Sequence, residues 1–232
     1  PAGIFLFSPE QVLTLGVINS ASDLKAIAAL RGIGFAQDLN VGGDLLLQAN
    51  TDITLAAGQR MDVAGNTTLI ANGSLLLDGV LASVEYVDLR AADGVRLFQV
   101  GTGGAGRVTA GAGGITVDSL FQAANDVIFD SVGDILGSGN GIHLVGQNLT
   151  LTSSAGAVGS MTQLLVGDSN GTVNIAANDG VYYEERVGDL LSDSITTVNG
   201  SMNLLVAGNG DLGKLTSSIQ AVAQALGPNN GG

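Results

Sequence analysis

The most polar cluster in this 232-residue chain is residues 182–186, a run of tyrosine, glutamate and arginine. Cleavage of a glycosidic bond uses two carboxylates about 5 to 9.5 Å apart, which makes Glu184 and Glu185 the first residues to examine for such chemistry. In a strand, however, Tyr182 and Glu184 share one face while Tyr183 and Glu185 share the other. The two glutamates therefore cannot form a facing pair by themselves.

A second carboxylate would have to come from a neighbouring part of the fold, with Asp189 and Asp193 as the candidates in sequence. The simpler interpretation is a solvated patch beside a corner of the chain. The chain has no tryptophan and three tyrosines, so the aromatic platforms that stack on sugars are scarce. Tyr182, Glu184, Glu185 and Arg186 nevertheless remain the residues to test for a glycan-active role.

Other nucleophile and base patterns are sparse. His143 is the single histidine and stands between Ile142 and Leu144, so we expect its imidazole to point outward if those two point inward. The chain has no cysteine and no G-x-S-x-G motif, which disfavours hydrolytic triads. The sequence assigns no catalytic, cofactor-binding or metal-binding residue.

Calcium is the most plausible ligand among weak candidates, because Asp and Asn recur near glycine-rich turns and hard cations favour oxygen donors. These turns are residues 133–134, 137–141, 167–171 and 208–211. The tandem nonapeptide of calcium-binding β-rolls is missing, and Asn and Asp also occupy turns simply because they tolerate left-handed backbone. The glycine-rich run 101–106 has no surrounding βαβ unit, so it fails as a dinucleotide-binding loop.

Composition excludes several classes of partner. The net charge is −13, which disfavours binding to nucleic acid and to anionic lipid surfaces. No apolar run reaches the roughly 18 residues of a membrane helix, so membrane insertion is not expected. Residues 1–7 lack the basic start and cleavage site of a signal peptide, and we expect the chain to be a segment of something longer.

A repeating unit determines how these residues are positioned. Short alternating apolar segments recur every 20 to 22 residues, beginning at positions 45, 67, 87, 107, 127 and 149. Further short strands lie between them, at residues 53–56, 75–78, 115–118 and 142–145. A fixed period of this size, with turns rather than helices between strands, predicts an all-β solenoid, a parallel β-helix.

Strand alternation also predicts the core. Ile53 and Leu55, like Leu149 and Leu151, are expected to point inward, while the threonines between them face solvent. The 36 glycines fit tight corners. A leucine-rich repeat has a similar period, but its L-x-x-L-x-L-x-x-N pattern and its helical half are missing.

Both ends depart from the repeat. Residues 20–32 place Leu24, Ile27 and Ala28 at helical spacing, and residues 217–226 likewise gather apolar side chains on one helical face. The predicted organisation is an N-terminal segment with a short capping helix (1–38), a parallel β-helix (39–212), and a C-terminal helix with a flexible tail (213–232).

Over residues 39–212 the chain resembles the filamentous-haemagglutinin-type repeat region of large bacterial exoproteins and adhesins. The resemblance rests on residues 148–159, 180–185, 188–190 and 200–207. It implies a right-handed β-helical rod on the bacterial cell surface or outside the cell, serving adhesion, biofilm matrix or contact between cells. The N-P-N-L and N-P-N-G-I elements that mark the secretion domain of such proteins are missing, which implies an interior segment.

The resulting expectation is a non-enzymatic rod in an adhesin stalk, fibre or matrix. Its expected partners are neighbouring copies or flanking repeats of the same protein, with host or matrix glycans as a further class. The alternative is a β-helical polysaccharide lyase or glycoside hydrolase.

Overall fold

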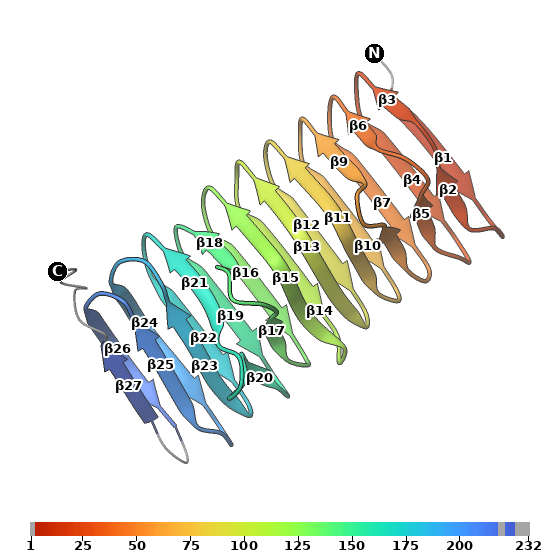
Figure 1. Cartoon of the computed structure of the whole chain (residues 1–232). Coiled ribbons are helices and arrows are strands. Elements are labelled where there is room, and N and C mark those ends of the chain that lie inside the picture. Colours follow the sequence, from red (N-terminus) through yellow and green to blue (C-terminus); the bar gives the residue numbers. More distant parts are fainter. Residues whose placement is uncertain (1–2, 218–220, 226–232) are drawn as a thin grey trace.

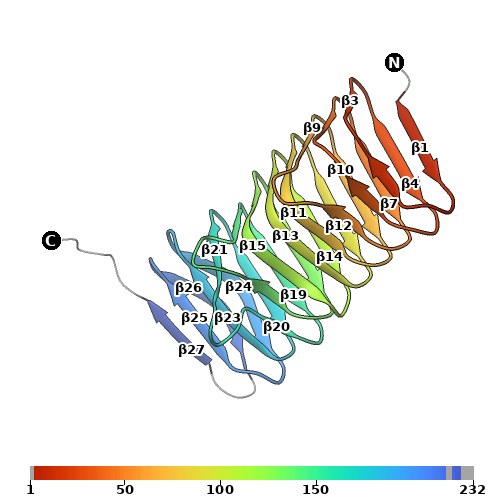
Figure 2. The ribbon, with the colours of Figure 1, turned by 45° about the vertical axis from the view of Figure 1, so that its right-hand side comes forward.

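The chain forms a stack of parallel coils. The computed structural model describes residues 3–217 and 221–225, which contain 27 strands and no helix. About 10 turns of chain follow one another in sequence order, from β1 at one end to β26 and β27 at the other (Figure 1, Figure 2). At about 4.8 Å per coil the stack is about 48 Å long. The predicted all-β solenoid is confirmed.

The first sheet is a single continuous ladder of 11 strands. In order these are β1 (Ile4–Ser8), β4 (Leu24–Ala28), β7 (Leu45–Ala49), β10 (Thr67–Ala71), β12 (Val87–Ala91), β14 (Gly106–Ala110), β16 (Val127–Ser131), β19 (Leu149–Ser153), β22 (Val173–Ala177), β24 (Leu190–Thr197) and β26 (Gly210–Thr216). Six of these strands begin at or within one residue of the six starting positions predicted from the repeat, namely β7, β10, β12, β14, β16 and β19.

The second sheet has 16 strands. They are β2 (Leu13–Leu15), β3 (Ile18–Ser20), β5 (Ile33–Phe35), β6 (Leu39–Val41), β8 (Ile53–Leu55), β9 (Arg60–Val63), β11 (Leu75–Ser83), β13 (Gly94–Thr102), β15 (Gly114–Ala123), β17 (Ile135–Gly137), β18 (Leu144–Gly146), β20 (Ala157–Val158), β21 (Leu165–Ser169), β23 (Gly180–Glu185), β25 (Met202–Val206) and β27 (Ala221–Ala225). On entering the middle coils, the long strand β11 pairs with two shorter strands of the preceding coil, β8 and β9.

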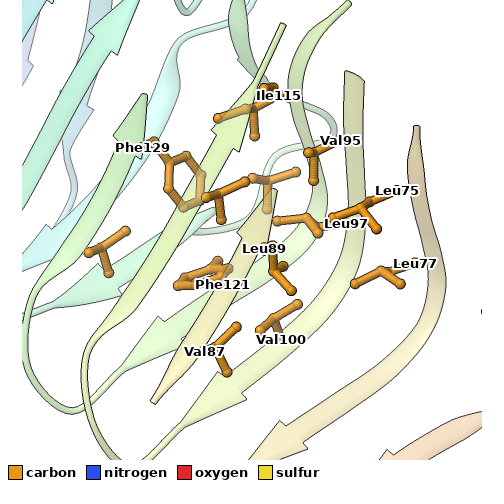
Figure 3. Close-up of a cluster of buried hydrophobic side chains, with 14 of the residues drawn as sticks. Leu75, Leu77, Val87, Leu89, Val95, Leu97, Val100, Ile115, Phe121 and Phe129 are labelled. Carbon is orange, nitrogen blue, oxygen red and sulfur yellow. The ribbon is translucent and has the colours of Figure 1, made fainter. Parts of the chain in front are cut away.

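The core is a narrow aliphatic column between the two sheets. Ile53, Leu55, Leu149 and Leu151 are at most 1% exposed, which confirms the predicted inward alternation. Figure 3 shows the centre of this column, where side chains from successive coils pack against one another. Most of its side chains are Leu, Val, Ile and Ala, and the fully buried rings of Phe121 and Phe129 pack among them.

Aspartates in the corners bind the next coil. The carboxylate Oδ1 of each accepts a backbone N–H about one coil further along the chain, at 2.7 to 3.0 Å. The acceptors are Asp23, Asp44, Asp52, Asp134 and Asp189. Among the described residues every positive φ belongs to a glycine, so tolerance of left-handed backbone is not what places Asp in these turns. The aspartates satisfy backbone donors that the corner would otherwise leave unpaired.

The predicted capping helix over residues 20–32 is wrong. Its residues form strand β4, with Leu24, Ala26 and Ala28 buried, and β4 pairs in register with β1 and β7. The apolar spacing fits both periods, and the ladder bonds offered by two neighbouring strands decide between them. Local helix propensity is a weak preference that tertiary pairing overrides.

The predicted C-terminal helix over residues 217–226 is also wrong where the structure describes it. Residues 221–225 form β27, which pairs in parallel with β25. Residues 218–220, residue 226 and the predicted flexible tail, residues 228–232, lie outside the described residues. No helix able to cross a membrane occurs in the described part of the chain.

Candidate functional site

Strand β23 carries the polar cluster singled out in the sequence. Tyr183 and Glu185 are fully buried, whereas Tyr182 and Glu184 lie on the outer face of the strand. The predicted alternation of the two glutamates is therefore confirmed. The solvated-patch interpretation is wrong for Tyr183 and Glu185, because both side chains belong to the core.

Inside the core these two residues form a hydrogen-bond network with Ser169 of β21. The Tyr183 hydroxyl donates to Glu185 Oε2 at 2.6 Å, and the Ser169 backbone N–H donates to Glu185 Oε1 at 2.7 Å. The Ser169 hydroxyl donates to Oε2 at 3.3 Å.

Burial raises the pKa of Glu185, and the bonds from Tyr183 and Ser169 oppose that rise. Burial and the nearby Glu185 raise the pKa of the Tyr183 hydroxyl well above 10.0. The carboxyl group of Glu185 thus has a structural role and is closed to any substrate.

On the outer face, Glu184 and Arg186 form an ion pair, with Arg186 Nε 2.7 Å from Glu184 Oε1. The hydrogen bond to Glu184 raises the pKa of Arg186, which stays charged. The pair lines a polar pocket of about 320 Å³. The lining residues are Gly139, Asn140, Thr162, Gln163, Leu164, Val166, Glu184 and Arg186.

Two lateral loops build the walls of this pocket. Residues 138–143 connect β17 to β18, and residues 159–164 connect β20 to β21; both loops are longer than the links at this position in the first coils. Gln163 Nε2 donates to the carbonyl oxygen of Gly139 at 2.9 Å, and Arg186 Nη1 donates to that of Asn140 at 2.5 Å. These bonds link three successive coils on one side of the stack.

Neither aspartate considered as a second carboxylate lines this pocket. Asp189 accepts the backbone N–H of Asn209 at 2.7 Å, as the other corner aspartates do. Asp193 lies in β24, which belongs to the opposite sheet. Glu184 is the single carboxylate among the described lining residues, so the pocket does not assemble the two-carboxylate arrangement of glycosidases.

His143 was expected to point outward, and this expectation is wrong. Its side chain is fully buried, because it precedes β18 in an irregular loop where strand alternation does not apply. The Val166 backbone N–H donates to His143 Nδ1 at 3.1 Å, so the ring proton lies on Nε2, which is 3.1 Å from the Ser138 carbonyl oxygen. Burial lowers the pKa of His143, the hydrogen bond to the Ser138 carbonyl opposes this in part, and the charge of Arg186 lowers the pKa further. The neutral ring thereby fixes one pocket loop to β21.

This burial predicts a pH dependence of stability. The pKa of His143 is lowered in the folded state. Below about pH 6.5 the imidazole therefore binds a proton in the unfolded chain but stays neutral in the folded chain. We expect the free energy of unfolding to fall as the pH drops from 7 through this range, with a slope approaching about 1.4 kcal/mol per pH unit.

Urea denaturation at pH 7, 6 and 5, compared with His143→Gln, measures this effect. Glu185 acts in the opposite direction, because a raised pKa favours the folded state on acidification. It is present in both proteins, so the difference between them isolates His143. Equal pH slopes in the two proteins would show that the ring is not held neutral by the fold.

For the turns considered for calcium, the described residues contain no group of three or more His, Cys, Asp or Glu side chains placed to hold a metal ion. Asp134, in one of those turns, instead accepts a hydrogen bond from the backbone N–H of Ala157 through its carboxylate oxygen.

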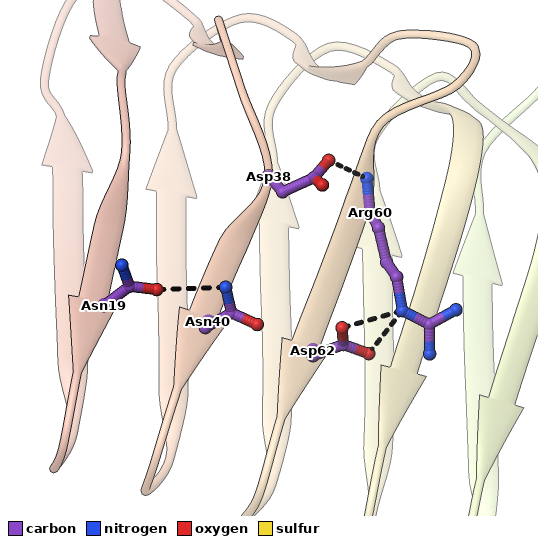
Figure 4. Close-up of polar contacts among 5 residues, drawn as sticks. All are labelled: Asn19, Asp38, Asn40, Arg60 and Asp62. Atoms are coloured by element: carbon purple, nitrogen blue, oxygen red, sulfur yellow. Dashed lines mark hydrogen bonds and ion pairs between the residues drawn. The ribbon is translucent and has the colours of Figure 1, made fainter.

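A larger hollow, which the sequence reasoning missed, lies near the start of the stack. It measures about 560 Å³ and runs along the corner after β3, β6, β9 and β11. Asn19, Asn40 and Asp62 face it from paired register positions on three neighbouring strands. Figure 4 shows this row, with Asn40 Nδ2 donating to Asn19 Oδ1 at 3.0 Å. The signal available in the sequence was the recurrence of polar residues at one coil's spacing.

Arg60 closes the row on one side. Its Nε lies 2.7 Å from Asp62 Oδ2, and its backbone N–H donates to Asp38 Oδ1 at 2.8 Å (Figure 4). The hydrogen bond to Asp62 and that residue's charge raise the pKa of Arg60. A second hollow of about 440 Å³ lies beside the row and shares Asn19 and Asn40 with the first.

A stack of parallel coils with an aliphatic core and side pockets formed by its loops and corners defines a parallel β-solenoid protein. No protein-family model matches the chain, and neither a curated protein nor a solved structure is significantly similar to it.

Proposed function

We propose that this chain is a non-enzymatic structural segment of a bacterial cell-surface or extracellular protein, in which it acts as a rigid rod in an adhesin stalk, fibre or biofilm matrix. The observation that carries the proposal is the first sheet, in which 11 strands pair in parallel without a break. Bending such a rod would stretch ladder hydrogen bonds on one side and compress packed side chains on the other.

The ends of the stack support a role in a longer assembly. β1 and β26 are the outer strands of the first sheet, and each has a paired neighbour on one side. Phe5 and Phe7 of β1 are 60% and 56% exposed. A sheet edge with unpaired backbone groups and exposed rings is suited to contact another coil, so flanking repeats or neighbouring copies are the proposed partners.

The chain's resemblance to filamentous-haemagglutinin-type repeats belongs to the same proposal. The repeat of 20 to 22 residues and the parallel coils are the features that support this resemblance. Surface location and adhesion follow from that resemblance, with host or matrix glycans as a further class of partner.

Small-angle X-ray scattering tests the rod. We expect the distance distribution of the purified chain to be that of an elongated particle, about 48 Å along its axis before end effects. Negative-stain microscopy at high protein concentration then shows whether the ends assemble into filaments. A distribution typical of a sphere would contradict the proposal.

The enzymatic alternative, a polysaccharide lyase or glycoside hydrolase, is tested by incubating the protein with polysaccharides and measuring the release of products. Product release from polysaccharides that is lost in Glu184→Gln would replace the non-enzymatic proposal. Glu184 is the informative position because it lines the pocket while Glu185 is buried.

A further inference from the structure

The corner hollow near the start of the stack has the form of a groove parallel to the rod axis. Its lining residues come from four successive coils, three from each. One set is the outward row, namely Asn19, Asn40, Asp62 and Ala82, which pair in register from strand to strand. Another is the corner set, Ala21, Gly42, Ala64 and Val84. The groove therefore presents nearly the same surface at each step of about 4.8 Å.

The two walls differ in polarity. The outward row offers amide groups: Asn19 and Asn40 are exposed, and the single bond between them leaves one amide nitrogen and one amide oxygen directed to solvent. The corner wall consists of small aliphatic groups without hydrogen-bonding side chains. A ligand that matches both walls has hydroxyl groups on its edges and C–H groups on its faces.

The charges disfavour an anionic ligand. Asp62, the carboxylate among the lining residues, is paired with Arg60. Asp38, which lies beside the row, adds a negative charge, and the chain as a whole carries −13. Anionic polymers, including nucleic acid and acidic polysaccharides, are thus repelled from this surface.

The step of the groove also argues against a peptide. An extended polypeptide advances about 3.3 Å per residue, so its side chains lose register with a coil spacing of about 4.8 Å. A sugar ring in an extended linear chain advances by nearly one coil spacing. We propose that this groove binds an uncharged, extended glycan whose chain lies along the rod axis. This inference rests on the proposed function in one respect: the cell surface and the extracellular space are where such glycans occur.

Isothermal titration calorimetry with neutral linear glucan oligosaccharides of increasing length tests the proposal. We expect affinity to rise with each added sugar up to about four units, the number of coils lining the groove, and then to level off.

Ala64→Leu fills the groove from an exposed corner position and is expected to weaken binding about tenfold or more. Asn40→Ala, which removes the central amide of the row, is expected to weaken it by a similar factor.

Ala155→Leu is the matched control, because Ala155 is an exposed alanine at the other corner of the stack. It should bind as the unmodified chain does. Circular dichroism on each variant verifies the fold, and the scattering measurement of rod shape is independent of binding. A rod that binds none of the oligosaccharides, or that binds them equally well with Ala64→Leu, overturns the glycan site and leaves the rod proposal standing.

Discussion

Replacing Glu185 by alanine is expected to lower the free energy of unfolding by about 2–4 kcal/mol. The substitution leaves the Tyr183 hydroxyl and the Ser169 backbone N–H without their acceptor in a part of the core closed to water. Each unsatisfied buried donor costs about 1–3 kcal/mol, and relief of the buried carboxyl's desolvation offsets part of the sum. Chemical denaturation at pH 7 measures the loss.

Glu184→Ala is the matched control, since it removes the same side chain one position earlier on the same strand. Its partner is Arg186 on the outer face, and ion pairs of this kind contribute about 0–1 kcal/mol. A smaller loss for Glu185→Ala than for Glu184→Ala would contradict the assignment of Glu185 to a structural network.

The second large effect is expected at the aromatic pair in the middle of the stack. Phe121 and Phe129 are fully buried, with ring centroids 5.1 Å apart in an edge-to-face arrangement at 84° (Figure 3). Phe129→Ala removes one ring of this pair and leaves a cavity beside Phe121 in the packed core. We expect a loss of about 3–5 kcal/mol in the free energy of unfolding.

Phe98→Ala provides the comparison, because Phe98 of β13 is 42% exposed on the outer face. The same change there should cost about 1 kcal/mol or less. Thermal unfolding followed by circular dichroism ranks the two variants. Similar melting temperatures would mean that the cavity left by Phe129 closes by movement of neighbouring coils.

The repeat could be predicted because its signal is redundant. Six strand starts and two alternating core pairs follow from apolar periodicity, since every coil buries the same positions against the same neighbours. The ends were harder: Leu24 and Ala28 fit a helix as well as a strand, and the choice depends on ladder bonds to strands far away in sequence. A short stretch of sequence does not show which distant strands will pair with it.

The features of the candidate sites could likewise be predicted only where they depend on local sequence. The opposite faces of Glu184 and Glu185 follow from strand alternation, which needs no more than the strand itself. The burial of His143 does not follow, because it depends on a loop folding back so that Val166 and Ser138 can bond the ring. The groove was missed because Asn19, Asn40 and Asp62 become neighbours through pairing between coils.

The register between coils also has a consequence for how this molecule can vary in length. Each strand of the first sheet pairs only with the strands one coil before and one coil after it. Removing or duplicating a whole coil therefore deletes or adds one set of contacts and leaves every other set as it was. A change of a few residues within a strand instead shifts the register and turns buried side chains toward solvent. Insertions and deletions should thus be tolerated in whole units of one coil or in the lateral loops, which makes the length of such a molecule adjustable in steps.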